Sequence, residues 1–234
     1  MQEIKNIFEH IGGRFIIPFE KFVEKCNNIK AFIFDWDGVF NSGTKGESNS
    51  SNFSEIDSMG TNMLRFGLWL THNQVPPVAI ITGEENKIAI NLTNREHFND
   101  FYFNCKNKRL AFKNFIEKHN LKPNEVAFCF DDILDLSIAE LCGLKFQVKH
   151  SASPLFDVYC INNNLSDYIT SNNGANYAVR EISELFLGIL NVHDKCLKHR
   201  ISFDETYSRY LNERNNINPN IYYQKNNSFI KINN

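Results

Sequence analysis

The chain has 234 residues and a formal net charge of −2, with 42% hydrophobic and 22% charged residues. This length is enough for one sizeable α/β domain with extensions. The near-neutral charge balance argues against a nucleic-acid partner, because such proteins carry a basic field. No apolar run approaches the roughly 20 residues of a membrane-spanning helix, and the N-terminus lacks the charged start and unbroken apolar core of a signal peptide. We therefore expect a cytoplasmic protein with no membrane partner.

The six cysteines are scattered along the chain. They form no C-x-x-C pair and no Cys/His cluster with zinc spacing, so a zinc site or a disulfide framework is not expected. We interpret them as reduced thiols that are mostly buried, which also fits a cytosolic compartment.

The N-terminal part of the chain, residues 1–29, reads as one or two short amphipathic helices. Its apolar residues recur at helical spacing until Gly12 and Gly13 break the pattern. Residues 31–35 then form a short apolar run without alternation, which is typical of a strand buried on both faces of a sheet. We expect this strand to open the main domain.

A polar segment, residues 41–52, follows that strand and contains no core-forming residue. We predict a loop or weak β-hairpin there. Asp57 or Ser58 is expected to cap the next helix. The apolar face predicted for that helix consists of Met59, Met63, Phe66 and Leu70.

Residues 76–190 alternate between short apolar strands and helical patterns. We predict strands at 76–83, 100–103, 125–132 and 144–148, helices at 84–94, 107–119, 133–141 and 178–190, and an irregular segment at 149–177. Such alternation implies right-handed crossovers and a parallel sheet covered on both faces. The fold class is therefore α/β, a Rossmann-like three-layer sandwich around a central parallel sheet.

The C-terminal part, residues 191–234, is rich in Asn and charged residues, with tyrosines interspersed. A helix over residues 194–213 is predicted. The last residues, about 20 in number, are expected to be disordered or docked on a partner subunit.

Polar residues that could take part in catalysis or binding follow four of the predicted strands. Asp35 and Asp37 come after the first strand, Thr82 after the second, and Lys108 beyond the third. The pair Asp131 and Asp132 ends the fourth. Because the carboxyl ends of parallel strands share one edge of a sheet, and ligands bind at that edge, we expect these groups to converge.

This set of groups suits phosphoryl chemistry. Carboxylates that meet at one point repel one another unless a hard cation such as Mg²⁺ neutralises them. Lys108 and Thr82 would hold phosphate oxygens. A free Asp carboxylate can attack phosphorus, and a second one can move protons to and from the reacting oxygens. Gly38 would allow the tight backbone bend that aims both carboxylates.

Four stretches carry a resemblance to the haloacid dehalogenase superfamily. FIFDWDGVF (32–40) resembles its first motif, AIITG (79–83) its second, and CKNKRLAF (105–112) and FDDILD (130–135) its third and fourth. More narrowly, the chain resembles the capless branch typified by 3-deoxy-manno-octulosonate 8-phosphate phosphatase. The closer match rests on FSEIDSMG (53–60), NKRLAF (107–112), CFDDILDLSIAELCGL (129–144) and SDYITSNNGANYAVREI (166–182).

The resemblance implies a role for each matching position. Asp35 would be the nucleophile and Asp37 the general acid and base. Asp35, the Asp37 main chain and Asp131 would bind Mg²⁺, and Asp132 would be a ligand through water or an orienting residue. Residues implied in binding the phosphosugar are Gly38, Thr82, Gly83, Lys108 and Arg180.

The resemblance also implies an organisation. Residues 30–190 would form the phosphatase domain, with residues 1–29 and 191–234 as extensions. There would be no large cap domain. Members of this branch form tetramers in which hairpins from neighbouring subunits close the active site, and the polar segment at 40–56 matches that hairpin in position. We therefore expect a homotetramer.

Several positions leave alternatives open. Phe130 stands where the fourth motif usually has Gly, and Glu84 stands where Arg often follows Thr-Gly. Glu84 would oppose an anionic substrate if it faced the site. Asp135 reads as an acid in the first turn of a helix, favoured by the dipole, rather than as a metal ligand. Arg180 would either contact the substrate or form a structural ion pair, and His150 is expected to face solvent or an interface.

We therefore predict a Mg²⁺-dependent phosphomonoester hydrolase that acts on a sugar-acid phosphate through an aspartyl-phosphate. A phosphatase for a nonulosonate 9-phosphate or another phosphosugar is the alternative with the same chemistry. A binding or assembly protein with little turnover on the same fold is the alternative from another class.

Overall fold

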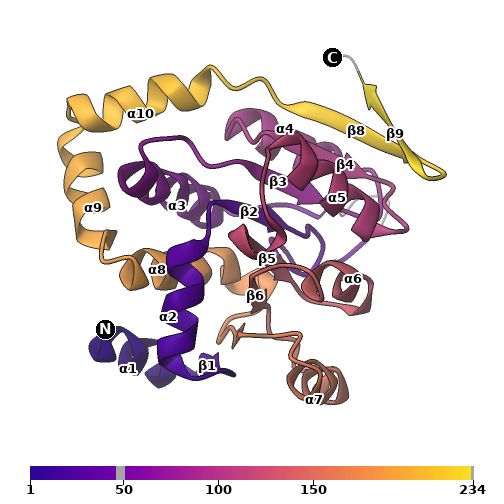
Figure 1. Cartoon of the computed structure of the whole chain (residues 1–234), viewed down its shortest axis with the longest axis horizontal. Coiled ribbons are helices and arrows are strands. Elements are labelled where there is room, and N and C mark those ends of the chain that lie inside the picture. Colours follow the sequence, from indigo (N-terminus) through magenta and orange to yellow (C-terminus); the bar gives the residue numbers. More distant parts are fainter. Residues whose placement is uncertain (46–50, 233–234) are drawn as a thin grey trace.

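The structure, a computed structural model, describes residues 1–45 and 51–232. The described chain forms one sheet of nine strands, flanked by helices (Figure 1). In sheet order the strands are β1 (Arg14–Phe15), β7 (Tyr168–Ile169), β6 (Leu144–Gln147), β5 (Val126–Phe130), β2 (Ala31–Phe34), β3 (Val78–Ile81), β4 (Asp100–Phe103), β8 (Asn220–Lys225) and β9 (Ser228–Ile232). All neighbours from β7 to β8 pair in parallel, and the outermost pairs β1–β7 and β8–β9 are antiparallel. The predicted α/β fold is confirmed, with a mixed rather than purely parallel sheet.

Helices cover both faces of this sheet. One face packs against α1 (Gln2–His10), α2 (Phe19–Asn28), α3 (Glu55–His72), α4 (Lys87–Arg95) and α8 (Ala178–Ile189), and the other against α5 (Lys108–Lys118), α6 (Leu136–Ala139) and α7 (Pro154–Asn162). Strand β2 shows why both faces are apolar: Phe32 and Phe34 point into the first core, and Ala31 and Ile33 into the second. Because side chains alternate along a strand, a fully apolar strand requires cover on both sides.

The C-terminal extension adds a second layer of helices outside α3. The predicted single helix over 194–213 is wrong, because the chain forms α9 (His193–Ser202) and α10 (Glu205–Asn215) instead. Phe203 adopts a left-handed conformation (φ 49°), which ends α9. Asp204 then caps α10 by accepting a hydrogen bond from the Tyr207 backbone N–H. A left-handed residue followed by a capping Asp is a local signal that helical periodicity does not detect.

Residues 220–232 belong to the main sheet, so the expectation of disorder is wrong for them. Strand β8 pairs with β4, and β9 folds back on β8 at one edge of the sheet (Figure 1). The Tyr222 ring stacks on Tyr102 with ring centroids 5.0 Å apart, and Tyr223 packs against Phe103. These aromatic pairs bury the edge that β4 would otherwise expose.

The segment 149–177 was also predicted wrongly, as irregular. It contains helix α7, which begins at Pro154, and strand β7, which extends the sheet beyond β6. Proline is well suited to the first turn of a helix because its missing N–H would have no partner there. In residues 1–29 the two predicted helices are present as α1 and α2, joined through β1, which pairs with β7.

The connection from β2 to α3 contains no helix or strand among its described residues, 35–45 and 51–54. A large cap domain is therefore not inserted there. The predicted hairpin lies partly on residues 46–50, which are outside the described chain. Helix α3 begins earlier than predicted, with Ser54 as its N-cap. Asp57, the predicted cap, is instead buried and accepts a hydrogen bond from the Arg180 backbone N–H.

None of the helices in the described chain combines the length and the apolar character needed to cross a membrane.

Candidate active site

The carboxyl ends of the central strands surround one cavity of about 420 Å³. Asp35 follows β2, Thr82 follows β3, and Asp131 follows β5, while Lys108 is the first residue of α5, which comes after β4. All four line this cavity. Since β5, β2, β3 and β4 are parallel neighbours, their carboxyl ends lie along the same sheet edge. The structure thus brings together residues that the sequence pattern predicted would converge.

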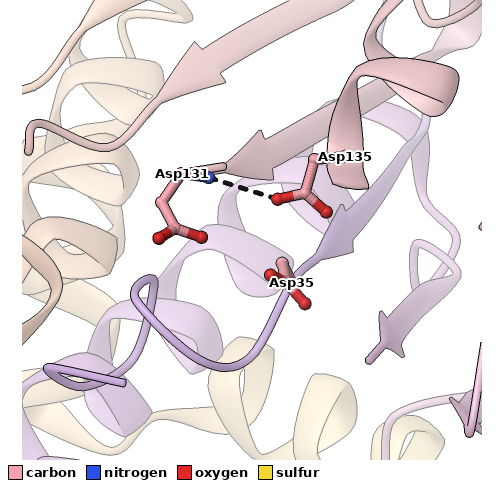
Figure 2. A group of neighbouring side chains, drawn as sticks. All are labelled: Asp35, Asp131 and Asp135. Atoms are coloured by element: carbon pink, nitrogen blue, oxygen red, sulfur yellow. Dashed lines mark hydrogen bonds between the residues drawn. The ribbon is translucent and has the colours of Figure 1, made fainter. Parts of the chain in front are cut away.

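Three buried carboxylates form a cluster at the floor of the cavity (Figure 2). Asp35, Asp131 and Asp135 each offer one oxygen, and these oxygens lie within 4.8 Å of one another. The Oδ1 atom of Asp131 is buried and has no hydrogen-bond partner. A buried oxygen without a donor is costly, and converging carboxylates are the ligands that hard divalent cations prefer. The donor set therefore fits Mg²⁺ or a similar ion.

The cluster contains Asp135, which sequence reasoning had placed only in the first turn of a helix. That part is correct: its Oδ2 atom accepts hydrogen bonds from the backbone N–H groups of Asp131 (3.4 Å) and Asp132 (3.3 Å), and the first of these is drawn in Figure 2. Its other oxygen faces the cavity floor and contacts Lys108. The D-x-x-D spacing of Asp132 and Asp135 is the local signal for this arrangement, since an acid at the third position of a helical turn reaches back to the backbone N–H groups before it.

Asp132 lines the cavity but stays outside the carboxylate cluster. Its Oδ1 atom accepts a hydrogen bond of 2.7 Å from the Ile133 backbone N–H. It thereby caps the short 3₁₀ helix at residues Ile133–Asp135. Of the predicted acidic pair, only Asp131 lies in the cluster.

Lys108 is held at the floor of the cavity by two carboxylates. Its side chain is 3% exposed, and its Nζ atom lies 2.6 Å from both Asp35 Oδ1 and Asp135 Oδ1. Burial lowers the pKa of Lys108, but the charges of Asp135 and Asp35 outweigh burial and raise it overall. The ammonium therefore remains charged at neutral pH.

Two of the floor acids, Asp35 and Asp131, are destabilised as anions. Burial, and then the charge of Asp135, raise the pKa of Asp35 well above its ordinary value, although Lys108 opposes the shift. Burial also raises the pKa of Asp131. Carboxyl groups with raised pKa values that share a cleft cost stability. Such groups are therefore typical of functional sites, where binding or catalysis requires them.

Gly38 is required by the close approach of the backbone to Asp131. Its φ angle is +85°, and a Cβ atom there would lie 1.9 Å from Asp131 Oδ2. Any side chain would therefore displace a member of the carboxylate cluster. Gly83 also lines the cavity, but a Cβ atom there would meet nothing within 4 Å.

Asp37 lies nearer the mouth of the cavity than the floor cluster does and is partly exposed. Its Oδ1 atom accepts a hydrogen bond from the Ser51 hydroxyl, and its Oδ2 atom lies 3.5 Å from Lys45 Nζ. The same Lys45 Nζ lies 2.8 Å from Glu84 Oε2. Glu84 therefore does face the site, with a lysine as its partner.

The structure also defines the surroundings of His150 and Arg180, two residues whose roles the sequence did not settle. His150 lines the cavity, with its Nε2 atom 3.0 Å from Asp131 Oδ2, and the bond to Asp131 raises the pKa of the imidazole. Arg180 does not line this cavity; its Nε atom donates to Glu184 Oε1 at 2.7 Å. Of the two roles considered for Arg180, the structure shows the ion pair.

Comparison with known proteins gives several matches. No family model matches the chain. The curated 3-deoxy-D-manno-octulosonate 8-phosphate phosphatase KdsC of Escherichia coli K12 is 30% identical over 165 residues, which is 70% of this chain and 82% of that protein. The structure of the phosphatase of the same name from Yersinia pestis is similar, with a TM-score of 0.63, 25% identity and coverage of 75% of this chain and 89% of that one.

A third match shows the same fold. It is the 3-deoxy-D-manno-octulosonate 8-phosphate phosphatase of Moraxella catarrhalis, solved in complex with a magnesium ion, a phosphate ion and a KDO molecule. The TM-score is 0.66 at 24% identity, and the alignment covers 80% of this chain and all of that one.

Proposed function

Because the chain belongs to the KdsC family of phosphatases, within the haloacid dehalogenase superfamily, we propose that it hydrolyses a sugar-acid phosphate in a Mg²⁺-dependent reaction. The first candidate substrate is 3-deoxy-D-manno-octulosonate 8-phosphate. The single observation that carries the proposal is the floor of the cavity. There the Asp35 carboxylate lies 2.6 Å from the buried ammonium of Lys108 and beside two further carboxylates.

In the proposed first step an oxygen of Asp35 attacks phosphorus, and the bond between phosphorus and the ester oxygen breaks. Asp37 gives a proton to the departing sugar oxygen. An aspartyl-phosphate on Asp35 results. Lys108 and the Thr82 hydroxyl hold the oxygens of the transferring phosphoryl group, so that its charge meets preorganised donors.

In the second step water attacks the phosphorus of the aspartyl-phosphate. Asp37, now deprotonated, takes a proton from that water, and the bond from phosphorus to the Asp35 oxygen breaks. Inorganic phosphate leaves and the free carboxylate returns. Because Asp37 gives one proton and takes one back, the enzyme ends the cycle unchanged.

Asp35, Asp131 and Asp135 are the residues that would hold the metal, with the Asp37 main chain as a further ligand. When bound, Mg²⁺ supplies charge neutralisation for the phosphoryl oxygens. The unpartnered Oδ1 atom of Asp131 supports this assignment. Asp132, which caps the short helix at Ile133–Asp135, would act through water or by orienting that turn.

The decisive test is hydrolysis of a panel of phosphate esters with Mg²⁺ present and after chelation. The panel contains 3-deoxy-D-manno-octulosonate 8-phosphate, a nonulosonate 9-phosphate, neutral sugar phosphates and a generic aryl phosphate. We expect the sugar-acid phosphates to give the highest kcat/KM, and chelation to abolish turnover. Turnover of neutral sugar phosphates alone would reassign the substrate, and no turnover of any ester would favour a binding protein.

Asp35→Asn tests the nucleophile. We expect activity to fall by at least about 10³-fold, because the amide oxygen is a poor nucleophile, while the thermal unfolding midpoint is kept or raised. Asp194→Asn is the matched control, since it makes the same chemical change at an exposed position outside the cavity wall. Comparable loss of activity in both variants would contradict the assignment of Asp35.

We also propose that a neighbouring copy of the chain covers the mouth of the cavity, in a homotetramer of the kind that the family resemblance implies. Leu134 supports this, because its side chain lines the cavity and is 65% exposed. Light scattering of the purified chain would give the mass, and a monomer with full activity would contradict this proposal.

A further inference from the structure

The mouth of the cavity carries a pair of charged side chains, Lys45 and Glu84, that the proposed chemical steps do not use. We propose that Lys45 selects substrates whose leaving group carries a carboxylate, by releasing Glu84 and binding the substrate's carboxylate in its place. This inference rests on the proposed function and concerns substrate choice at the same site.

The wall of the cavity carries more acidic than basic side chains. Among the described residues of its wall, two lysines, Lys45 and Lys108, and the imidazole of His150 stand against six acids: Asp35, Asp37, Glu84, Asp131, Asp132 and Asp135. A divalent metal ion at the floor offsets part of this excess and leaves the mouth acidic. A ligand with both a phosphate and a carboxylate therefore needs a positive group near the mouth, because like charges disfavour its entry.

The two lysines are not equivalent. Lys108 is buried and bound to Asp35 and Asp135 at the floor, so it can contact only the phosphoryl group of the substrate. The side chain of Lys45 is 52% exposed, and that of its partner Glu84 is 68% exposed. An ion pair between exposed, flexible side chains is weak in water. A substrate carboxylate can therefore replace Glu84 at little cost.

The position of Lys45 relative to Asp37 indicates which end of the substrate it meets. Its Nζ atom lies 3.5 Å from Asp37 Oδ2. In the proposed mechanism Asp37 protonates the departing sugar oxygen, so a group next to Asp37 and nearer the mouth faces the leaving group. Lys45 therefore stands on the sugar side of the reacting phosphorus, and Lys108 on the phosphoryl side. An ammonium on the sugar side suits a sugar acid better than a neutral sugar.

The test compares two esters in wild type and in Lys45→Met. One ester is 3-deoxy-D-manno-octulosonate 8-phosphate and the other is p-nitrophenyl phosphate, whose leaving group carries no carboxylate. We expect the variant to raise KM for the sugar acid by about tenfold or more, and KM for the aryl ester by less than about twofold. Lys45→Arg should restore most of the difference, because it keeps the charge.

Two variants complete the design. Lys113→Met removes another exposed lysine, paired with Glu117 on α5 and outside the cavity wall, and should change neither KM. Glu84→Gln removes the competing carboxylate and should lower KM for the sugar acid by about two- to fivefold, with little effect on the aryl ester. This decrease should shrink when Glu84→Gln is combined with Lys45→Met.

The outcomes separate the two proposals. Equal changes of KM for both esters in Lys45→Met, or no change for either, would overturn the role of Lys45 and leave the proposed function intact. If the wild-type enzyme turned over the aryl ester but not the sugar acid, the proposed substrate would be wrong, and the role of Lys45 with it.

Discussion

Two groups of buried polar side chains differ in how they are paired: the charged residues at the floor of the cavity, and Asn62, Tyr207 and Tyr210 between α3 and α10. At the floor they are charged and incompletely paired: two of the three clustered acids bind Lys108, and a buried oxygen of the third, Asp131, has no donor. The side chains of Asn62, Tyr207 and Tyr210 are neutral and paired with one another. The Tyr210 hydroxyl donates to Asn62 Oδ1 (3.0 Å), and Asn62 Nδ2 donates to the Tyr207 hydroxyl (2.9 Å).

This difference in pairing shows that unfavourable electrostatics are confined to the cavity in this comparison. A neutral, fully paired network stabilises the docking of α10 because no buried donor or acceptor of its Asn and Tyr side chains is left over. A cluster of acids raises its own pKa values and costs stability, which is tolerable where a substrate and a cation will complete the charge balance. Substitutions in the two regions should therefore separate activity from stability.

The largest effect is expected from Lys108→Met. The variant keeps the volume but leaves Asp35 and Asp135 without their cation, so the pKa of Asp35 rises further and the phosphoryl oxygens lose a donor. We expect kcat/KM to fall by about 10³-fold and the free energy of unfolding to fall by roughly 3–5 kcal/mol. Kinetics and urea unfolding measure the two effects, with Lys113→Met as the control. A change confined to KM would contradict the placement of Lys108 at the reacting group.

The helical region should behave in the opposite way. Tyr210 is fully buried against Phe66 and Trp69, so Tyr210→Ala should lower the free energy of unfolding by about 3–5 kcal/mol while kcat of the folded enzyme stays unchanged. Tyr210→Phe removes only the hydroxyl and should cost about 1–3 kcal/mol. Urea unfolding, with activity assayed below the transition, gives both numbers. A drop in kcat without loss of stability would show that this region is coupled to the site.

An effect that appears only as pH changes concerns Asp57, which lies in the first turn of α3 and is buried against the start of α8. Burial raises its pKa to about 7, although the Arg180 N–H and charge oppose the shift. The unfolded chain loses this proton near pH 4 and the folded protein near pH 7. Stability should therefore fall as pH rises between these values and then level off.

Asp57→Asn removes this titration and should flatten that fall. Between pH 4.5 and 8 we expect the stability of the variant relative to wild type to rise by about 3 kcal/mol. Urea unfolding at both pH values measures the difference, and the unchanged groups cancel in the comparison. A constant difference between the two proteins would mean that Asp57 is ionised throughout.

The central strands and the polar residues at their ends could be predicted from sequence. Strands β2, β3, β4 and β5 are short apolar runs, buried on both faces, and their pattern does not depend on distant contacts. The four strands at the ends of the sheet, β1, β7, β8 and β9, have weaker sequence patterns and were not predicted. Strand β7 has two residues, and β8 and β9 owe their place to aromatic contacts with β4 and with each other.

In the site, too, some residues could be predicted from local sequence and others depend on tertiary contacts. Asp35, Thr82, Lys108 and Asp131 were predicted to converge because each follows a strand of one parallel sheet. Asp135 and His150 were missed as members of the cavity wall, since their orientation depends on how a short 3₁₀ turn and a loop pack against the floor. For Arg180 the sequence left substrate contact and a structural ion pair open, and its side chain bonds within its own helix.

The sequence by itself determined the central strands, the helices between them and the residue types at the strand ends, because hydrophobic period and strand-end position are local properties. Tertiary structure alone decided which carboxylates meet, that Lys108 lies between two of them, and that Lys45 pairs with Glu84 at the mouth. Those relations depend on the packing of segments separated by tens of residues, and on how burial shifts charge, which no local pattern contains.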